Sequence, residues 1–259
     1  SQLEGRGFYV SASVKAVHLK NFRWEVGASV GHYKNEVTAL PNNNRPVETD
    51  IYGATVLTQV GQPVGVFYGW DSDGVYATSA EAAAEGKYLV SGNGDHINFG
   101  AGDMRFKDVD NNHVIDNADR VVIGDPNPDL FGNIFTTLNW KNLTLSAAFN
   151  YSLGNDIYNY QRSLLEGGSL FLNQTTAMSR RWTTEGQHTS IPRVAYGDPM
   201  GNSRFSDRWI EDGSYLRLSS VTLSYHIPIG STYLQGSTVW GNAANLLTIS
   251  RCLGNNHDC

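Results

Sequence analysis

Several features that would define other protein classes are absent from this sequence. Charged residues make up only 17% of its 259 residues, the net charge is −6, and no run of Lys and Arg occurs. Nucleic-acid-binding domains need a basic stripe to meet the phosphates, so the composition argues against such a partner. There is also no apolar run of about 18 residues, which a membrane-spanning helix requires. A barrel strand needs only about 9–11 residues of alternating pattern, so a membrane is not excluded.

Cysteine is almost absent. Cys252 and Cys259 are the two cysteines, and both lie in the last eight residues. A disulfide between them would close a very short loop and would not hold the fold together. The compartment cannot be read from them.

Motifs that mark enzymes are missing as well. The sequence contains no HExxH, GxSxG or Walker motif. Asp207, Glu211 and Asp212 offer a pair of acids of the kind that hydrolyses sugars. They lie in a segment rich in charge, where a solvated loop is the simpler interpretation. We therefore predict that the chain is not an enzyme.

Aromatic residues, by contrast, reach 11%, and the chain contains 27 glycines. Apolar and polar residues alternate over residues 7–17 and again over 22–31, on either side of a turn at 20–21. A period of two over this length predicts two long strands with one apolar face each. The opposite face carries Arg23 and Glu25, which suits either water or the wet interior of a barrel.

A second hairpin is predicted at 130–140 and 143–152, around a turn at Lys141 and Asn142. A short helix is expected at 80–85 with Ser79 as its N-cap, and short strands are expected near 55–60 and 64–70. Residues 153–213 show no sustained period. Two further strands follow at 215–227 and 233–247. Tight turns that alternate with very long connections are typical of an outer-membrane barrel.

An acidic loop precedes the second hairpin. Carboxylates, one amide and one backbone carbonyl occupy positions 1, 3, 5, 7, 9 and 12 of a twelve-residue window, as in an EF-hand loop that binds Ca²⁺. The predicted ligands are Asp108, Asp110, Asn112, Val114 (through its carbonyl), Asp116 and Asp119. His113 stands where glycine usually makes the turn, and Asp119 is shorter than the usual Glu. An ordinary solvated acidic turn is the alternative.

Aromatic residues in the connections form a second candidate site. Aromatic faces beside amide side chains commonly bind sugars or peptides, although such rings equally well pack loops together. The candidate ligand-binding residues are Tyr68, Trp70, Trp182 and Trp209.

Six segments carry a resemblance to a known family. They occur in the same order as in that family, and together they span most of residues 61–247. They are 61–69 (GQPVGVFYG), 102–108 (GDMRFKD), 123–129 (IGDPNPD), 154–159 (GNDIYN), 181–183 (RWT) and 206–218 (SDRWIEDGSYLRL). In these segments the chain resembles the C-terminal part of a SusC/RagA-type TonB-dependent outer-membrane transporter.

The resemblance implies an all-β fold: a fragment of an antiparallel transmembrane barrel with long extracellular loops. In the family the barrel has 22 strands and holds an N-terminal plug. Residues 1–250 would belong to the barrel and 251–259 would be an atypical tail. The plug and the segment that contacts the TonB complex are not expected in this chain.

The function implied is active, TonB-dependent import of oligosaccharides or peptides across the outer membrane of a Gram-negative, Bacteroidota-like cell. A SusD-like surface lipoprotein and the lipid of the membrane would be its partners. The competing hypothesis is a secreted, calcium-stabilised β-sandwich that binds glycans. In that fold the apolar strand faces would pack against each other rather than against lipid.

Overall fold

The computed structural model describes residues 1–228 and 236–252. Antiparallel strands dominate these residues, as predicted. None of their helices is both long and apolar enough to span a membrane. The tail residue Cys259 and the predicted strand start at 233–235 lie outside the described residues.

Contacts divide the chain into two compact units that interleave along the sequence. The first, the loop unit, contains residues 39–126 and 157–211. The second, the sheet unit, contains residues 2–38, 127–156, 212–228 and 236–252 of the described chain. The predicted stretch 1–250 thus contains both a strand-rich part and a separate core built from its long connections.

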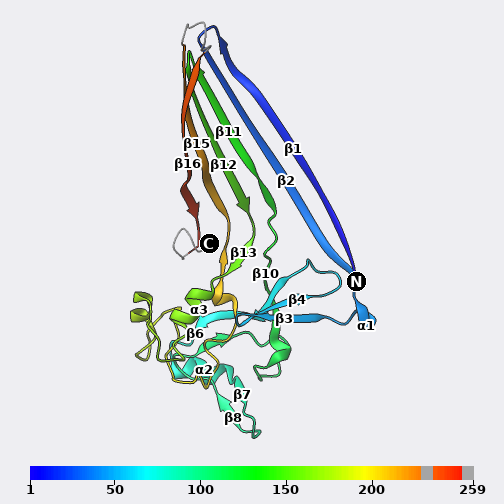
Figure 1. The fold of residues 1–259 in the computed structure, drawn as a ribbon. Coiled ribbons are helices and arrows are strands. Elements are labelled where there is room, and N and C mark those ends of the chain that lie inside the picture. The colour runs from blue at the N-terminus through cyan, green and yellow to red at the C-terminus, as the bar shows by residue number, and fades with distance from the viewer. Residues whose placement is uncertain (229–235, 253–259) are drawn as a thin grey trace. The chain divides into compact units, whose positions relative to one another are not determined.

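The sheet unit is one six-stranded antiparallel sheet in the order β1-β2-β11-β12-β15-β16 (Figure 1). Its strands are β1 (Gln2–Leu19), β2 (Phe22–Ala39), β11 (Leu130–Trp140), β12 (Leu143–Leu153), β15 (Tyr215–Ile227) and β16 (Ser237–Ser250). The predicted positions of β11 and β15 are confirmed to the residue. The first two strands are longer than the alternation indicated, because β1 and β2 extend into segments without a clean period.

Register places the apolar residues of neighbouring strands on the same face. Ile134 lies opposite Ala28 and Phe149, and Leu145 lies opposite Leu138 and Leu223. Because side chains alternate along a strand, the residues between them form a second, polar face. That face carries the following set: Arg23, Glu25, Asn133, Thr137, Asn150, Ser220 and Thr222.

Large apolar residues of the sheet are exposed in this chain. Ile134 is 40% exposed, Leu223 49% and Ile249 60%. A β-sandwich would cover such a face with a second sheet. Among the described residues no sheet does so, and the arrangement instead fits a barrel wall.

The loop unit contains short strands, helices and turns. Its four-stranded sheet has the order β10-β5-β4-β3, and two-stranded sheets pair β6 with β9 and β7 with β8. The elements are α1 (Pro41–Asn44), β3 (Val47–Ile51), β4 (Ala54–Thr58), β5 (Val66–Trp70), β6 (Ser72–Val75), α2 (Ser79–Glu85), β7 (Tyr88–Val90), β8 (His96–Asn98), β9 (Met104–Phe106), η1 (Asn117–Asp119), β10 (Arg120–Gly124), α3 (Tyr160–Glu166), η2 (Thr176–Arg180) and η3 (Asp207–Trp209). Two more short strands, β13 (Asp156–Tyr158) and β14 (Ile210–Asp212), lie at the unit boundaries.

Helix α2 forms where the sequence predicts it, but its N-cap is Thr78 rather than Ser79. The Thr78 side chain accepts a hydrogen bond from the backbone N–H of Glu81 at 3.2 Å. Glu81 reaches back to the N–H of Ala77 at 2.9 Å, so two otherwise unpaired donors are satisfied. Gly86 then ends the helix in the left-handed conformation (φ 62°).

The loop unit has its own apolar core. It consists of Tyr76, Ala82, Phe99, Met104, Phe106, Ile115 and Met200. Met200 and α3 both lie in residues 153–213, the segment whose sequence shows no sustained period. Residues 157–211 are therefore folded against the earlier part of the chain, through contacts distant in sequence that periodicity does not reveal.

Candidate cation loop and its surroundings

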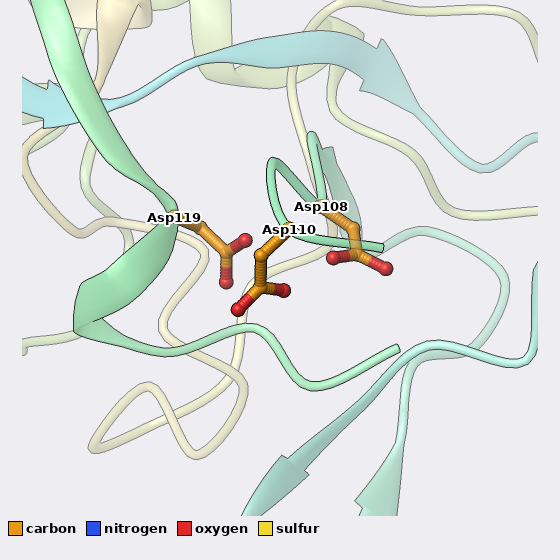
Figure 2. Close-up of side chains that lie close together, drawn as sticks. All are labelled: Asp108, Asp110 and Asp119. Atoms are coloured by element: carbon orange, nitrogen blue, oxygen red, sulfur yellow. The ribbon is translucent and has the colours of Figure 1, made fainter. Parts of the chain in front are cut away.

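The acidic loop joins β9 to β10 in the loop unit, and its two ends meet. One carboxylate oxygen each from Asp108, Asp110 and Asp119 lies within 4.8 Å of the others. Figure 2 shows Asp119 facing the two aspartates from the opposite side of the loop. Three of the six predicted ligands are thus brought together by the fold.

Asp108 organises the first half of the loop. Its carboxylate accepts hydrogen bonds from the backbone N–H groups of Asn112 at 3.1 Å and His113 at 2.8 Å. His113 has a φ of 64°, so it makes the left-handed turn for which other loops use glycine. Burial acts to raise the pKa of Asp108, but the donated N–H groups outweigh it, and the pKa is lowered.

Asp119 ties the end of the loop to its beginning. Its side chain is 1% exposed and accepts hydrogen bonds from the N–H of Val109 at 2.7 Å and of Asp116 at 2.9 Å. Burial, with the nearby charge of Asp119, raises the pKa of Asp110. A divalent cation would relieve this crowding of negative charge.

Two other predicted ligands face the backbone. The amide oxygen of Asn112 accepts from the N–H of Val114 at 2.6 Å, while its nitrogen donates to Asp110 at 2.9 Å. Asp116 caps η1 by accepting from the N–H of Ala118 at 2.6 Å. Three convergent carboxylates fit a hard divalent cation such as Ca²⁺. Asn112 would join them only after its amide turns over.

A buried polar network supports the strand that leads into the loop. Asp103 is 0% exposed and accepts two hydrogen bonds from the Arg193 guanidinium, at 2.7 and 2.9 Å. It also accepts from the side-chain amide of Asn202 and the N–H of Gly100, both at 2.9 Å. These residues carry no signal in the sequence, because nothing in the local pattern links positions 90 or more apart.

The four predicted ligand-binding aromatics have structural contacts in the loop unit. The Trp70 indole donates to the Asp116 carbonyl at 2.9 Å, and Arg120 lies over the rings of both Tyr68 and Trp70. Trp182 donates to the Ala77 carbonyl at 3.1 Å. Trp209 is 1% exposed, so its ring faces are covered and its predicted contact with ligand does not fit this structure.

A more accessible aromatic pair lies elsewhere in the same unit. Phe171 is 89% exposed and Tyr196 is 71% exposed, yet their rings stack with centroids 4.8 Å apart. Both occur in the loop segments without periodicity. Their aromatic side chains could have identified them as candidate ligand-binding residues, but only the fold shows that they meet at the surface.

Comparison with known proteins gives consistent relatives, although no family model matches. The chain is 31% identical to TonB-dependent receptor P3 of Formosa agariphila over 257 residues, which is 96% of this chain and 24% of that protein. It is 24% identical to TonB-dependent receptor SusC of Bacteroides thetaiotaomicron over 230 residues, covering 86% of this chain and 20% of SusC. The chain thus spans about a quarter of the length of the curated relatives it matches.

Solved structures of the RagAB peptide transporter share the fold. One superimposes with a TM-score of 0.70 at 22% identity, covering 97% of this chain and 26% of that one. The open-open state of the RagAB importer gives 0.71 at 21% identity, with the same coverage. These relatives are receptors and importers, in agreement with the prediction that the chain is not an enzyme. Over nearly its whole length the chain is therefore similar to TonB-dependent receptors, SusC among them, and it shares the fold of the RagAB transporter.

Proposed function

We propose that this chain contributes barrel strands and outer loops to a TonB-dependent importer of oligosaccharides or peptides in the outer membrane. A SusD-like surface lipoprotein would close over the loops, and the TonB complex would drive uptake. The observation that carries the proposal is the two-faced sheet, apolar on one side and polar on the other, over strands of 11–18 residues. Strands of this length and pattern suit a barrel wall between lipid and a wet interior.

The long connections belong on the cell exterior in this arrangement. Outer-membrane barrels have short turns toward the periplasm and long loops toward the outside. The turns at 20–21 and 141–142 are short, whereas the loop unit is built from residues 39–126 and 157–211. The exposed pair of Phe171 and Tyr196 would then meet the incoming substrate, because aromatic faces bind both sugars and peptides.

Calcium binding by the acidic loop is a second proposal, with a structural role. An ion held by Asp108, Asp110 and Asp119 would join the start of the loop to the start of β10. The convergence of these three carboxylates supports it. The ion would act as a clip that keeps an outer loop folded, and no transport step depends on it.

Uptake by living cells tests the importer proposal. The intact gene would be deleted, and cells would be supplied with fluorescent oligosaccharide and peptide libraries. We expect loss of uptake for one library, restored by the wild-type gene. A Phe171→Ala, Tyr196→Ala double variant should restore less uptake, while a Leu172→Ala variant serves as a control beside the pair. Undiminished uptake of both libraries after deletion would contradict the proposal.

A further inference from the structure

Aromatic rings interrupt the polar face of the sheet unit. Phe131 and Phe135 lie on this face of β11, and Tyr9 and Tyr33 lie on it in β1 and β2. These four residues are called the aromatic patch. Tyr9 is 60% exposed, Tyr33 43% and Phe131 37%. Exposed rings are unexpected on a face that otherwise carries hydroxyls, amides and a few charges, as the interior of a barrel does.

Glycines on β2 determine how these rings lie. Phe131 is directly opposite Gly31, and Phe135 is directly opposite Gly27. A Cβ added to Gly31 would lie 2.8 Å from the Phe131 ring and 3.2 Å from the Tyr9 ring, so the two rings meet above the glycine. A Cβ added to Gly27 would clash with the Phe135 ring. Each ring therefore rests on the backbone of the neighbouring strand and leaves its other side toward the polar side of the sheet.

A row of polar side chains crosses the sheet beside the rings. Asn133 follows Phe131 on the same face of β11, and Asn150 of β12 lies directly opposite Asn133. Arg217 of β15 lies opposite Asn150 in turn, and its Nε donates to the Thr248 hydroxyl at 3.1 Å. A side-chain amide offers both donors and an acceptor, and a sugar hydroxyl needs both. The row therefore complements a molecule with many hydroxyl groups.

The place of these residues within the sheet favours a sugar over a peptide. Strands β2, β11 and β12 lie inside the sheet, each between two hydrogen-bonded neighbours. An extended peptide gains its backbone hydrogen bonds by adding to a free sheet edge, and the backbone of these strands is already paired. A sugar can instead bind through side chains alone, with its C–H groups on ring faces and its hydroxyls on amides. Because Arg217 is the one charged residue among the patch and the two amides beside it, a neutral sugar fits best.

We propose that the aromatic patch, with Asn133 and Asn150 beside it, is a binding subsite for neutral oligosaccharides on the inner wall of the barrel. The inference rests on the proposed function, because the polar face must line the interior of an importer. It narrows that function to oligosaccharides. Sugar rings stack on Tyr9 and Phe131, and their hydroxyls exchange hydrogen bonds with the two amides.

Uptake of the fluorescent oligosaccharide and peptide libraries tests the subsite. Each variant of the intact gene is returned to the deletion strain, and uptake is expressed per receptor in the outer membrane. A Tyr9→Leu, Phe131→Leu double variant removes two ring faces but keeps apolar cover over Gly31. A Tyr9→Phe, Phe131→Tyr double variant retains the rings. Tyr225→Leu is the control, because Tyr225 is 48% exposed and lies opposite Leu143 on the apolar face.

Deletion should abolish uptake of the oligosaccharide library. The double leucine variant should restore about tenfold less of it at limiting substrate, as expected when two stacking contacts are lost. The ring-retaining variant and Tyr225→Leu should match the wild type. Asn150→Leu leaves every ring in place and should also lower oligosaccharide uptake severalfold, so the test does not depend on packing over Gly31.

Two results would overturn the subsite while import itself stands. One is wild-type oligosaccharide uptake per receptor by the double leucine variant, which would mean that the rings only support the sheet. The other is loss of peptide uptake alone in the deletion strain. Retention of both kinds of uptake after deletion would instead refute the proposed function.

Discussion

The carboxylate of Asp103 and the guanidinium of Arg193 form a bidentate ion pair across 90 residues of sequence. Asp103 is fully buried, whereas the Arg193 side chain is 43% exposed. The pair joins the strand that leads into the acidic loop to the segment that follows Trp182. It therefore fixes the position of two connections relative to each other within the loop unit.

Replacement of Asp103 should loosen both connections. Asp103→Asn keeps the shape but leaves Arg193 without its charged partner, and we expect local stability to fall by about 2–3 kcal/mol, somewhat less than for a fully buried pair. Hydrogen–deuterium exchange of residues 100–106 and 191–204 measures the effect. Arg6→Ala removes an exposed pair with Glu4 and should change nothing measurable. Faster exchange at 100–106 alone would contradict the proposed link.

Gly102 should tolerate no side chain, for two separable reasons. Its φ is 84°, and an added Cβ would clash with the Trp182 ring. Gly94 has a similar φ of 87° with no atom within 4 Å, so Gly94→Ala measures the backbone strain alone, about 1–2 kcal/mol. Gly102→Ala should cost about 1–3 kcal/mol more from the clash. Equal losses of stability in the two variants would show that Trp182 does not pack there.

Calcium removal should expose the acidic loop to proteolysis. Ion binding to the folded loop contributes about 2.7 kcal/mol when calcium is at a hundredfold excess over its Kd. A chelator should therefore speed cleavage between Lys107 and Arg120 in the wild type. Asp108→Ala should be cleaved quickly with or without calcium, and Asp95→Ala, which alters an acid outside the loop, should behave as the wild type. Identical cleavage with calcium and chelator in the wild type would refute the clip.

Acid should weaken the region around Glu85. Burial acts to raise the pKa of this carboxylate, but contacts from Lys87, Tyr76 and Arg105 outweigh it and lower the pKa. Because the pKa of Glu85 is lower in the folded than in the unfolded protein, Glu85 stabilises the fold at pH values above its unfolded pKa, near 4.3. This stabilisation is lost as the pH falls through the folded pKa. The opening free energies of residues 76–89, measured by hydrogen exchange from pH 3 to 7, should therefore decrease as the pH is lowered. Glu85→Gln should make these free energies less dependent on pH. An unchanged pH dependence in this variant would contradict its assignment to Glu85.

The sheet could be predicted from the sequence because strand alternation is a local signal. Residues 130–140 and 215–227 carry that signal clearly, and the structure places β11 and β15 there. The core of the loop unit could not be predicted in this way. Met200 joins Phe106 in that core, and Asp103 pairs with Arg193, through contacts that only the folded chain brings together.

The acidic loop was predictable in spacing but not in detail. The spacing anticipated that Asp108 and Asp119 would meet, since an EF-hand-like loop closes on itself. It could not show that Asn112 and Asp116 would satisfy nearby backbone N–H groups instead. Similarly, the exposed Phe171 and the buried Trp209 have equivalent aromatic signals in sequence, and only packing separates them.

Spin labelling along β12 tests the central claim, that the sheet is a membrane wall, most directly. Single labels would be placed at Leu143, Thr144, Leu145 and Ser146 in the receptor reconstituted in lipid. Collisions with oxygen, which concentrates in the lipid, should be frequent at Leu143 and Leu145 and rare at Thr144 and Ser146. This alternation follows from the period of two along the strand. Uniform collision rates at the four positions, or rates that peak at Thr144 and Ser146, would contradict the account.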